Sequence, residues 1–172
     1  EDIAYSYRTG NHGDGSWYSI NGNIDYQRTS RKNKQRMITF SYKINTQPQT
    51  SNSNTGYEDI HAKEEVDDLV KRLLLKNSQS DGKTNTMEQT FQVDYTTPIG
   101  ELHTVEAGAK YIFRRNTSDN KLYEAAGGSD DYLYNEDRSS DYRHLNHILA
   151  AYLGYTLKYK DFTFKPGVRY EQ

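Results

Sequence analysis

The chain has 172 residues, of which 33% are hydrophobic and 27% charged, and its mean hydropathy of −1.06 excludes a large dry core. Its 16 Tyr and only three Pro argue against disorder, because disordered segments are poor in aromatic residues and rich in proline. A net charge of −2 provides no basic field for nucleic acid, and the absence of Cys excludes disulfides and cysteine-based zinc sites.

The first two predicted elements are β-strands near residues 16–28 and 36–46, joined by a short polar stretch. Apolar and polar residues alternate in both with a period of two, as in strands that have one apolar face. In the first strand, for example, Ile24 and Tyr26 share one face and Asp25 lies on the other.

Residues 47–85 are predicted to form a long loop that contains one short helix. Between Tyr57 and Asn77 the apolar residues recur at spacings of three and four; they are Ile60, Val66, Leu69, Val70, Leu73 and Leu74. Acidic residues from Glu58 to Asp68, Glu65 among them, precede basic ones in an order that suits the helix dipole. We expect this helix to pack on neighbouring loops, and the alternative is a lid or a partner-binding helix.

Four further strands are predicted near residues 86–97, 102–115, 143–159 and 161–171. Each shows the same period-two alternation. A tight turn, Thr97 to Glu101, joins the first two, and Tyr159 to Asp161 joins the last two. Between these pairs lies a second long loop, residues 116–142, rich in Gly, Asp, Ser and Tyr.

The connections therefore alternate between short and long. In antiparallel order this brings all short turns to one end and all long loops to the other, which is the layout of an outer-membrane barrel. We predict an all-β fold: an antiparallel up-and-down meander of about six long strands from a large transmembrane β-barrel, with one short helix in a long loop. The alternative is a soluble β-sheet with one dry face, such as a carbohydrate-binding module.

The two faces of the predicted strands carry the chemistry that such a barrel needs. We expect the apolar face, with Tyr18, Phe40, Tyr95 and Leu153, to contact outer-membrane lipid. Aromatic residues gather near strand ends, as in the aromatic girdles of membrane barrels. The opposite, polar face would line a wet lumen; its charged residues are Asp25, Lys43, Asp94, Glu106, Lys110, Arg169 and Glu171.

Two segments resemble a known family. The first runs from Asp94-Tyr95 through Pro98 into Glu106-Ala107-Gly108-Ala109-Lys110-Tyr111, and the second is Gly167-Val168-Arg169-Tyr170-Glu171. Both are similar to the TonB-dependent outer-membrane receptor β-barrels of Bacteroides-type bacteria, in which an Asp-Tyr-x-x-Pro turn leads into a Glu-x-Gly-x-Lys-Tyr strand. In strand and loop rhythm the resemblance covers the whole chain, and in residue detail about a quarter of it.

The resemblance implies an internal fragment of a barrel of about 22 strands in the outer membrane of a Gram-negative bacterium. In that family an N-terminal plug domain closes the barrel, and an inner-membrane energy-coupling protein drives uptake of an unknown small nutrient or chelate. From this resemblance we expect the plug to lie outside this chain. The two open edges of a six-stranded sheet lead us to expect that the fragment self-associates through them.

Candidate ligand or lumen residues are Glu106, Lys110, Arg169 and Glu171 on the polar faces and Tyr132 and Tyr134 in the second long loop. We expect the charges to pair with one another across strands; the alternative is that they guide a substrate or contact the plug. For the tyrosines we favour packing between loops over stacking on a sugar or an aromatic chelate.

We expect no catalytic residue, cofactor or metal, because no catalytic or nucleotide-binding motif is present and the protein is predicted not to be an enzyme. The acidic second loop could bind Ca²⁺ through its carboxylates, although its spacing is not that of an EF-hand. His144 and His147 lie at an odd offset, which places them on opposite faces of a strand.

Overall fold

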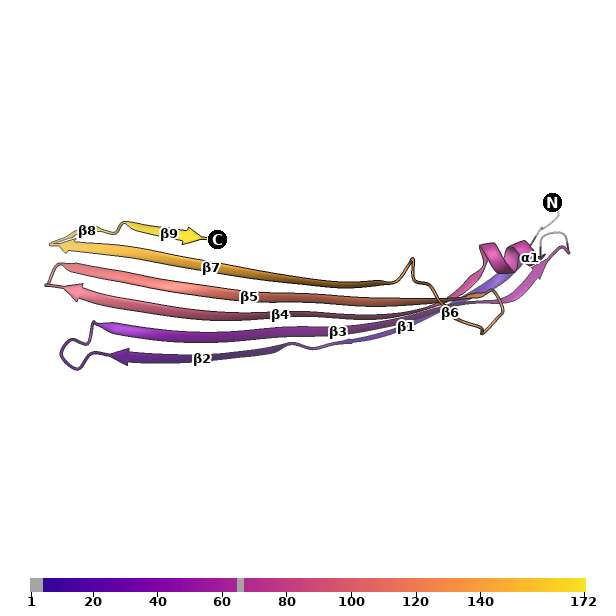
Figure 1. The fold of residues 1–172 in the computed structure, drawn as a ribbon, viewed down its shortest axis with the longest axis horizontal. Helices are drawn as coiled ribbons and strands as arrows, with labels where there is room; N and C mark the ends of the chain where they lie inside the picture. The colour runs from indigo at the N-terminus through magenta and orange to yellow at the C-terminus, as the bar shows by residue number, and fades with distance from the viewer. Residues whose placement is uncertain (1–4, 65–66) are drawn as a thin grey trace. The chain divides into compact units, whose positions relative to one another are not determined.

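The computed structural model describes residues 5–64 and 67–172 and consists mainly of one β-sheet with the strand order β1-β3-β4-β5-β7-β8 (Figure 1). In addition, β2 pairs with β3, β6 with β5 and β9 with β7. The chain divides into two compact units. Unit 1 contains the chain up to Tyr18, Gln47–Asn85 and Asn116–Arg143, and unit 2 contains Ser19–Thr46, Thr86–Arg115 and His144–Gln172.

Unit 2 is an antiparallel meander with short turns. Its strands are β2 (Ile20–Thr29), β8 (Phe162–Phe164), β9 (Gly167–Glu171) and parts of β3 (Met37–Ala62), β4 (Lys76–Ile99), β5 (His103–Ala126) and β7 (Ser140–Tyr159). The turns β2–β3, β4–β5 and β7–β8 lie together at one end of this unit (Figure 1). β1 (Tyr5–Trp17) and β2 both pair with β3, and β8 and β9 both pair with β7, so the meander has six strand positions. The predicted fold class is thereby confirmed.

The register of β2 against β3 fixes which residues share a face. Ile24 lies opposite Tyr42 and Tyr26 opposite Phe40, while Asp25 lies opposite Ser41. Because side chains alternate between the two faces of a sheet, the apolar pairs gather on one face and the polar pairs on the other. The alternation of apolar and polar residues in the sequence therefore produces one apolar and one polar surface of the sheet.

Proline interrupts both outer strand positions. Residues 161–171 were expected to form one strand, but Pro166 divides β8 from β9; the N–H of Tyr155 donates to the Pro166 carbonyl at 3.0 Å. Similarly, β1 ends at Trp17, where the N–H of Tyr18 donates to the Pro48 carbonyl at 3.3 Å. Proline accepts a ladder hydrogen bond but has no N–H to donate one, so the pairing pattern is lost locally.

Unit 1 differs from the expected long loops, because much of it is β-strand. β3 continues to Ala62, β4 begins at Lys76 and β5 continues to Ala126, and β6 (Leu133–Tyr134) pairs with β5. Strand β1, which begins well before the predicted start at residue 16, pairs with β3 from Tyr5–Ala62 to Trp17–Gln49. These strands carry polar residues on both faces, so they lack the apolar alternation by which strands are recognised.

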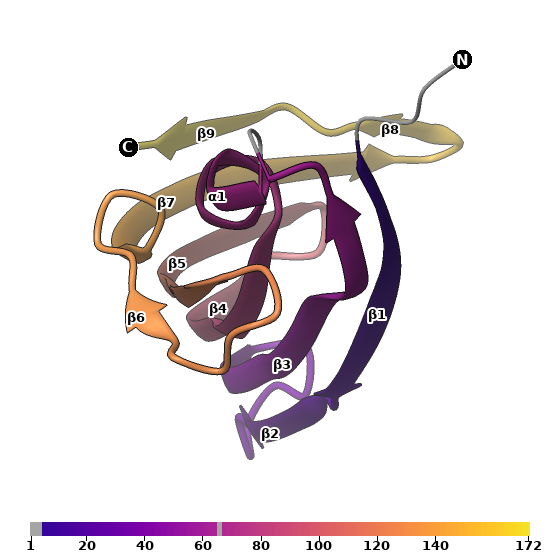
Figure 2. The same cartoon turned by 90° about the vertical axis from the view of Figure 1, so that its right-hand side faces the viewer.

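The helix is much shorter than the expected span from Tyr57 to Asn77. It consists of α1 (Asp67–Leu69) followed by the π-helical turn η1 (Val70–Leu74) and connects β3 to β4 (Figure 2). Residues up to Ala62 and from Lys76 onward are strand because their backbone groups belong to the sheet. Two residues of the predicted helix, Glu65 and Val66, lie outside the described residues. No helix in the described part of the chain is both long and apolar enough to cross a membrane.

The helix packs on a neighbouring loop, as we predict from the sequence. Val70 is 2% exposed and the Leu75 N–H donates to the Val70 carbonyl at 2.7 Å. The N–H of Gly127, in the second loop, donates to the carbonyls of Leu75 at 2.7 Å and Lys71 at 2.9 Å. The helical turn is therefore fixed to that loop within unit 1, although Leu69, Leu73 and Leu74 are exposed.

Candidate functional site

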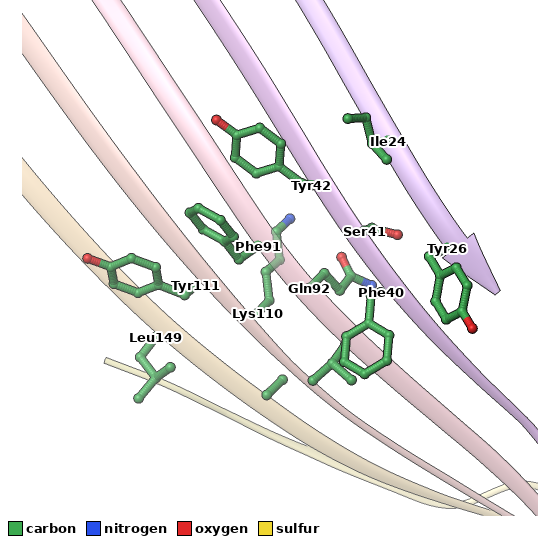
Figure 3. A pocket seen from close by; sticks show the side chains of 12 residues that line it. Ile24, Tyr26, Phe40, Ser41, Tyr42, Phe91, Gln92, Lys110, Tyr111 and Leu149 are labelled. Atoms are coloured by element: carbon green, nitrogen blue, oxygen red, sulfur yellow. The ribbon is translucent and has the colours of Figure 1, made fainter. Parts of the chain in front are cut away.

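A row of rings crosses the apolar face of unit 2. The centroids of Tyr42 and Phe91 lie 4.8 Å apart and those of Phe91 and Tyr111 lie 6.4 Å apart (Figure 3). The Tyr111 hydroxyl is 2.7 Å from Nδ1 of His147. The row thus connects β3, β4, β5 and β7 on one surface.

A second His–Tyr pair lies on the same face: Nδ1 of His103 is 2.5 Å from the hydroxyl of Tyr155. The two pairs are eight residues apart on both β5 and β7, which is about 26 Å along a strand. The side chains that face the same way between them are all apolar: Val105, Ala107, Ala109, Leu149, Ala151 and Leu153. This spacing is close to the apolar band of membrane barrels, roughly 25 Å tall and flanked by aromatic girdles.

The apolar face is exposed and contains a shallow hollow. Leu153 is 52% and Phe40 48% exposed. The hollow has a volume of about 490 Å³, and Figure 3 shows the side chains around it; the apolar ones include Ile24, Tyr26, Phe40, Val93, Ala109 and Leu149. Water is a poor solvent for such a surface, whereas lipid acyl chains fit its chemistry.

The opposite face of unit 2 is a network of polar side chains. The Tyr152 hydroxyl donates to Oδ1 of Asp94 at 2.5 Å, and its ring crosses Gly108 on the strand between them. A Cβ at Gly108 would lie 2.6 Å from Cζ of Tyr152 and 2.7 Å from Oδ1 of Asp94, so only glycine leaves room for this contact. We did not anticipate the pair from the sequence; the signal was a glycine within the alternation of a strand, which indicates a close approach.

Among the described residues, three of the seven predicted lumen charges form ion pairs, and neither of these pairs joins two of the predicted charges across strands. Arg169 donates to Glu171 at 2.5 Å. Glu106 forms an ion pair with Lys165 at 3.3 Å and not with Lys110. It also lies beside Gly154, where a Cβ, if one were present, would be 3.6 Å from Oε2 of Glu106. Within the described residues, the Lys110 ammonium forms no ion pair or hydrogen bond.

A polar hollow of about 550 Å³ lies on this face. The residues around it include Asn21, Asn23, Asp25, Lys43, Glu88 and Gln92. Glu88 accepts two hydrogen bonds from the Arg114 guanidinium, at 2.9 and 2.6 Å, which hold its carboxylate in place. Unit 2 therefore presents a polar, charged surface behind its apolar one.

Unit 1 brings one of the two loop tyrosines into a second polar hollow, of about 430 Å³. Tyr132 and Tyr57 line it together with Asn11, His12, Asn54, Glu58 and Asp130. Tyr134 is not part of it; its ring lies 5.6 Å from that of Tyr123 at 58° and is 54% exposed. Aromatic rings beside amide and carboxylate groups provide stacking surfaces and hydrogen bonds for a small polar ligand.

Two side chains hold the second loop in unit 1. The buried Asn77 accepts the Tyr57 N–H at 2.8 Å and donates to the Ser129 carbonyl at 3.1 Å. Glu124 accepts hydrogen bonds from Asn135 and Arg138, both at 2.6 Å. The hydrogen bond from Asn135, with the charges of Lys76 and Arg138, holds the pKa of the Glu124 carboxyl below its ordinary value. Among the described residues, no three His, Asp or Glu side chains come together as a metal site.

The model of the outer membrane protein β-barrel family matches residues 30–172. A search among curated proteins gives no match.

Proposed function

The chain belongs to the outer membrane protein β-barrel family and lies in the cell outer membrane, and we propose that it forms part of the wall of a receptor that takes up a nutrient or chelate. The observation that carries this proposal is the pair of opposed surfaces in unit 2. One is apolar between two His–Tyr pairs, and the other is lined with charged and amide side chains. A wall between lipid and a wet lumen requires this division.

Energy-coupled uptake of the TonB-dependent type is the mode of transport that we propose. A large ligand-gated barrel needs a removable plug, and the lumen charges with their partners are the groups that a plug would contact. Lys110, without a partner in the described part of the chain, is our first candidate for that contact. The inner-membrane energy-coupling protein would act through the plug.

We propose that ligand capture occurs on unit 1, at the hollow beside Tyr57 and Tyr132. Unit 1 carries nine Lys and Arg against 17 Asp and Glu, a net charge of −8, so nucleic acid would be repelled from it. The protein would bind and pass on its ligand without chemical change and would not be an enzyme. The soluble carbohydrate-binding module considered above conflicts with location in the outer membrane.

The remaining strands of the barrel are the partners that we propose for the two sheet edges, β1 and β2 on one side and β8 and β9 on the other. Backbone groups at the edges of unit 2, on β2 and on β8 and β9, would otherwise stay unpaired within the membrane, which is strongly unfavourable. Self-association of the isolated chain through the same edges stays a prediction.

Accumulation of labelled ligands in cells tests the uptake proposal. Cells that lack the gene, and cells complemented with it, would be compared for accumulation of a ferric chelate, cobalamin and a panel of oligosaccharides. We expect loss of at least one of them, and the same loss in cells without the energy-coupling protein. Accumulation that needs the barrel but not the energy-coupling protein would show a passive channel instead.

A further inference from the structure

The turn between β2 and β3 carries a cluster of positive charge. Residues 28–36 contain five basic side chains and no acidic one: Arg28, Arg31, Lys32, Lys34 and Arg36. All five are exposed, and none of them forms an ion pair with any residue that the structure describes. Like charges so close together repel one another, and nothing in the described part of unit 2 neutralises them.

The turn itself is ordered by its own backbone. The N–H of Ser30 donates to the Arg36 carbonyl at 2.9 Å, and the N–H of Arg36 donates to the Asn33 carbonyl at 3.0 Å. Nε of Arg36 also donates to Oγ1 of Thr97 at 3.0 Å, which ties the turn to β4. The basic side chains are thus displayed by a defined loop.

The cluster begins where the apolar face ends. Tyr26 and Phe40 lie opposite each other with ring centroids 6.4 Å apart, and the next pair on the same face is Arg28 with Ile38. Two residues advance a strand by about 7 Å. Aromatic rings of membrane proteins lie at the membrane–water interface, and the long side chain of Arg extends past it. Since Arg28 follows Tyr26 on this face, its guanidinium is placed at the level of the lipid headgroups.

The other short turns of unit 2 do not share this charge. The β4–β5 turn carries Glu101, and the β7–β8 turn carries Lys160 next to Asp161. Positive charge is therefore a property of the β2–β3 turn and not of this end of the sheet in general.

We propose that the β2–β3 turn binds the phosphate groups of anionic phospholipids, with Arg28, Arg31, Lys32 and Lys34 as the binding side chains. Short turns of membrane barrels face the periplasm, so the lipids would belong to the periplasmic leaflet. Clusters of Lys and Arg beside a membrane-spanning element bind anionic lipid through charge, with each cation near the surface contributing roughly a fivefold increase in affinity. The proposal rests on location in the outer membrane and is independent of uptake.

An acidic polymer or peptide in the periplasm has a similar charge and is the competing partner. Position favours lipid, because Arg28 shares a face with Tyr26 and Ile24, and a soluble partner would not need a cation on that face. The experiment below separates the two.

Binding of fluorescent phosphatidylglycerol and phosphatidylcholine to the full-length protein in neutral detergent tests the proposal. The variant Arg31→Gln/Lys32→Gln/Lys34→Gln removes three cations and leaves Arg36, which anchors the turn. We expect about 100-fold weaker binding of phosphatidylglycerol, unchanged binding of phosphatidylcholine, and weaker binding of the wild type as salt is raised. The control Lys83→Gln/Lys121→Gln/Arg143→Gln makes the same change in net charge within unit 1 and should bind like the wild type.

A charge-preserving variant, Arg31→Lys/Lys34→Arg, separates loss of charge from loss of folding and should keep its affinity. Equal binding of the two lipids, or unchanged binding by the Gln variant, would overturn the proposal. Displacement of phosphatidylglycerol by inorganic phosphate at millimolar concentration would indicate a site for free anions. Tighter binding of polyglutamate than of phosphatidylglycerol would assign the turn to an acidic polymer. Both outcomes contradict a lipid site.

Discussion

The two units of this chain use the same secondary structure in opposite ways. Unit 2 has one apolar and one polar face and a net charge of +6, from 13 basic and seven acidic residues. Unit 1 has polar residues on both faces, a net charge of −8 and a small core around Val70, Leu75 and Ala125. A strand in lipid must be apolar on one side, whereas a strand with water on both sides is held mainly by its backbone ladder and its polar side chains.

Two different sequence patterns therefore form β-strands within this one chain. In unit 2 one face contacts lipid and the other contacts water, so apolar and polar residues alternate along each strand with a period of two. In unit 1 neither face is dry, so Asn, Ser, Thr, Asp and Gly suffice and no period appears.

The largest effect is expected from a charge on the apolar face. Ala151→Arg should lower the free energy of unfolding by about 2–4 kcal/mol, because exposed Ala151 lies midway between the two His–Tyr pairs and therefore near the middle of the bilayer. Equilibrium unfolding by guanidinium in lipid vesicles measures this. The control is Asn54→Arg on β3 of unit 1, an exposed position that should change stability by less than about 0.5 kcal/mol. Equal losses in both variants would remove the distinction between the two units.

Gly108→Ala should be the next most damaging, because its Cβ would overlap the Tyr152 ring and displace it from Asp94. We expect a loss of about 1–3 kcal/mol, as for other overpacked sites, measured by the same unfolding experiment. Gly10→Ala on β1 is the matched control, since a Cβ there would meet no atom within 4 Å. Tyr152→Phe, which keeps the ring and removes the hydroxyl, should lose only the contribution of the hydrogen bond, about 1 kcal/mol.

Glu124→Gln should loosen the second loop of unit 1 without affecting unit 2. The folded-state pKa of Glu124 lies below its ordinary value of 4.5, so its contribution is complete above that pH and is lost as the pH falls through the folded pKa. The protection of residues 127–139 against hydrogen exchange, which is the exchange rate corrected for the intrinsic rate at each pH, should therefore fall on acidification in the wild type. In the variant this protection should be roughly tenfold lower at neutral pH and should change less with pH. A wild-type loop whose protection is constant down to pH 3 would contradict this role.

The smallest effect is expected at Arg8. It lies 2.9 Å from Glu58 and 3.0 Å from Asp59, which a β-bulge brings to the same side; the φ of Asp59 is 51°. Both ion pairs are more than half exposed, so Arg8→Gln should cost only about 0–1 kcal/mol. Thermal unfolding in low and high salt would measure it. A loss that exceeds that of Gly108→Ala would mean that unit 1 depends on its ion pairs far more than its exposure suggests.

The candidate site could be predicted only in part. The sequence supplied the polar face and its charges, including Arg169 with Glu171, because they stand two apart on one strand. The ion pair of Glu106 with Lys165 and the hydrogen bond from Tyr152 to Asp94 could not be predicted from the sequence. The partners lie 58 or more positions apart in the chain and meet only through the register of the sheet. Likewise, only the register of the sheet places His103 and His147 each beside a tyrosine of a neighbouring strand.

The amino-acid sequence alone is enough to predict the antiparallel meander, its six strand positions and the two faces of unit 2, because lipid on one side and water on the other impose a pattern that can be read residue by residue. That residues 47–62, 76–85 and 116–126 are strands, and that the helix among the described residues comprises Asp67–Leu74, follows only from the three-dimensional structure. The reason is that a strand with water on both faces is specified by backbone hydrogen bonds to its neighbours, and backbone groups are the same in every residue except proline.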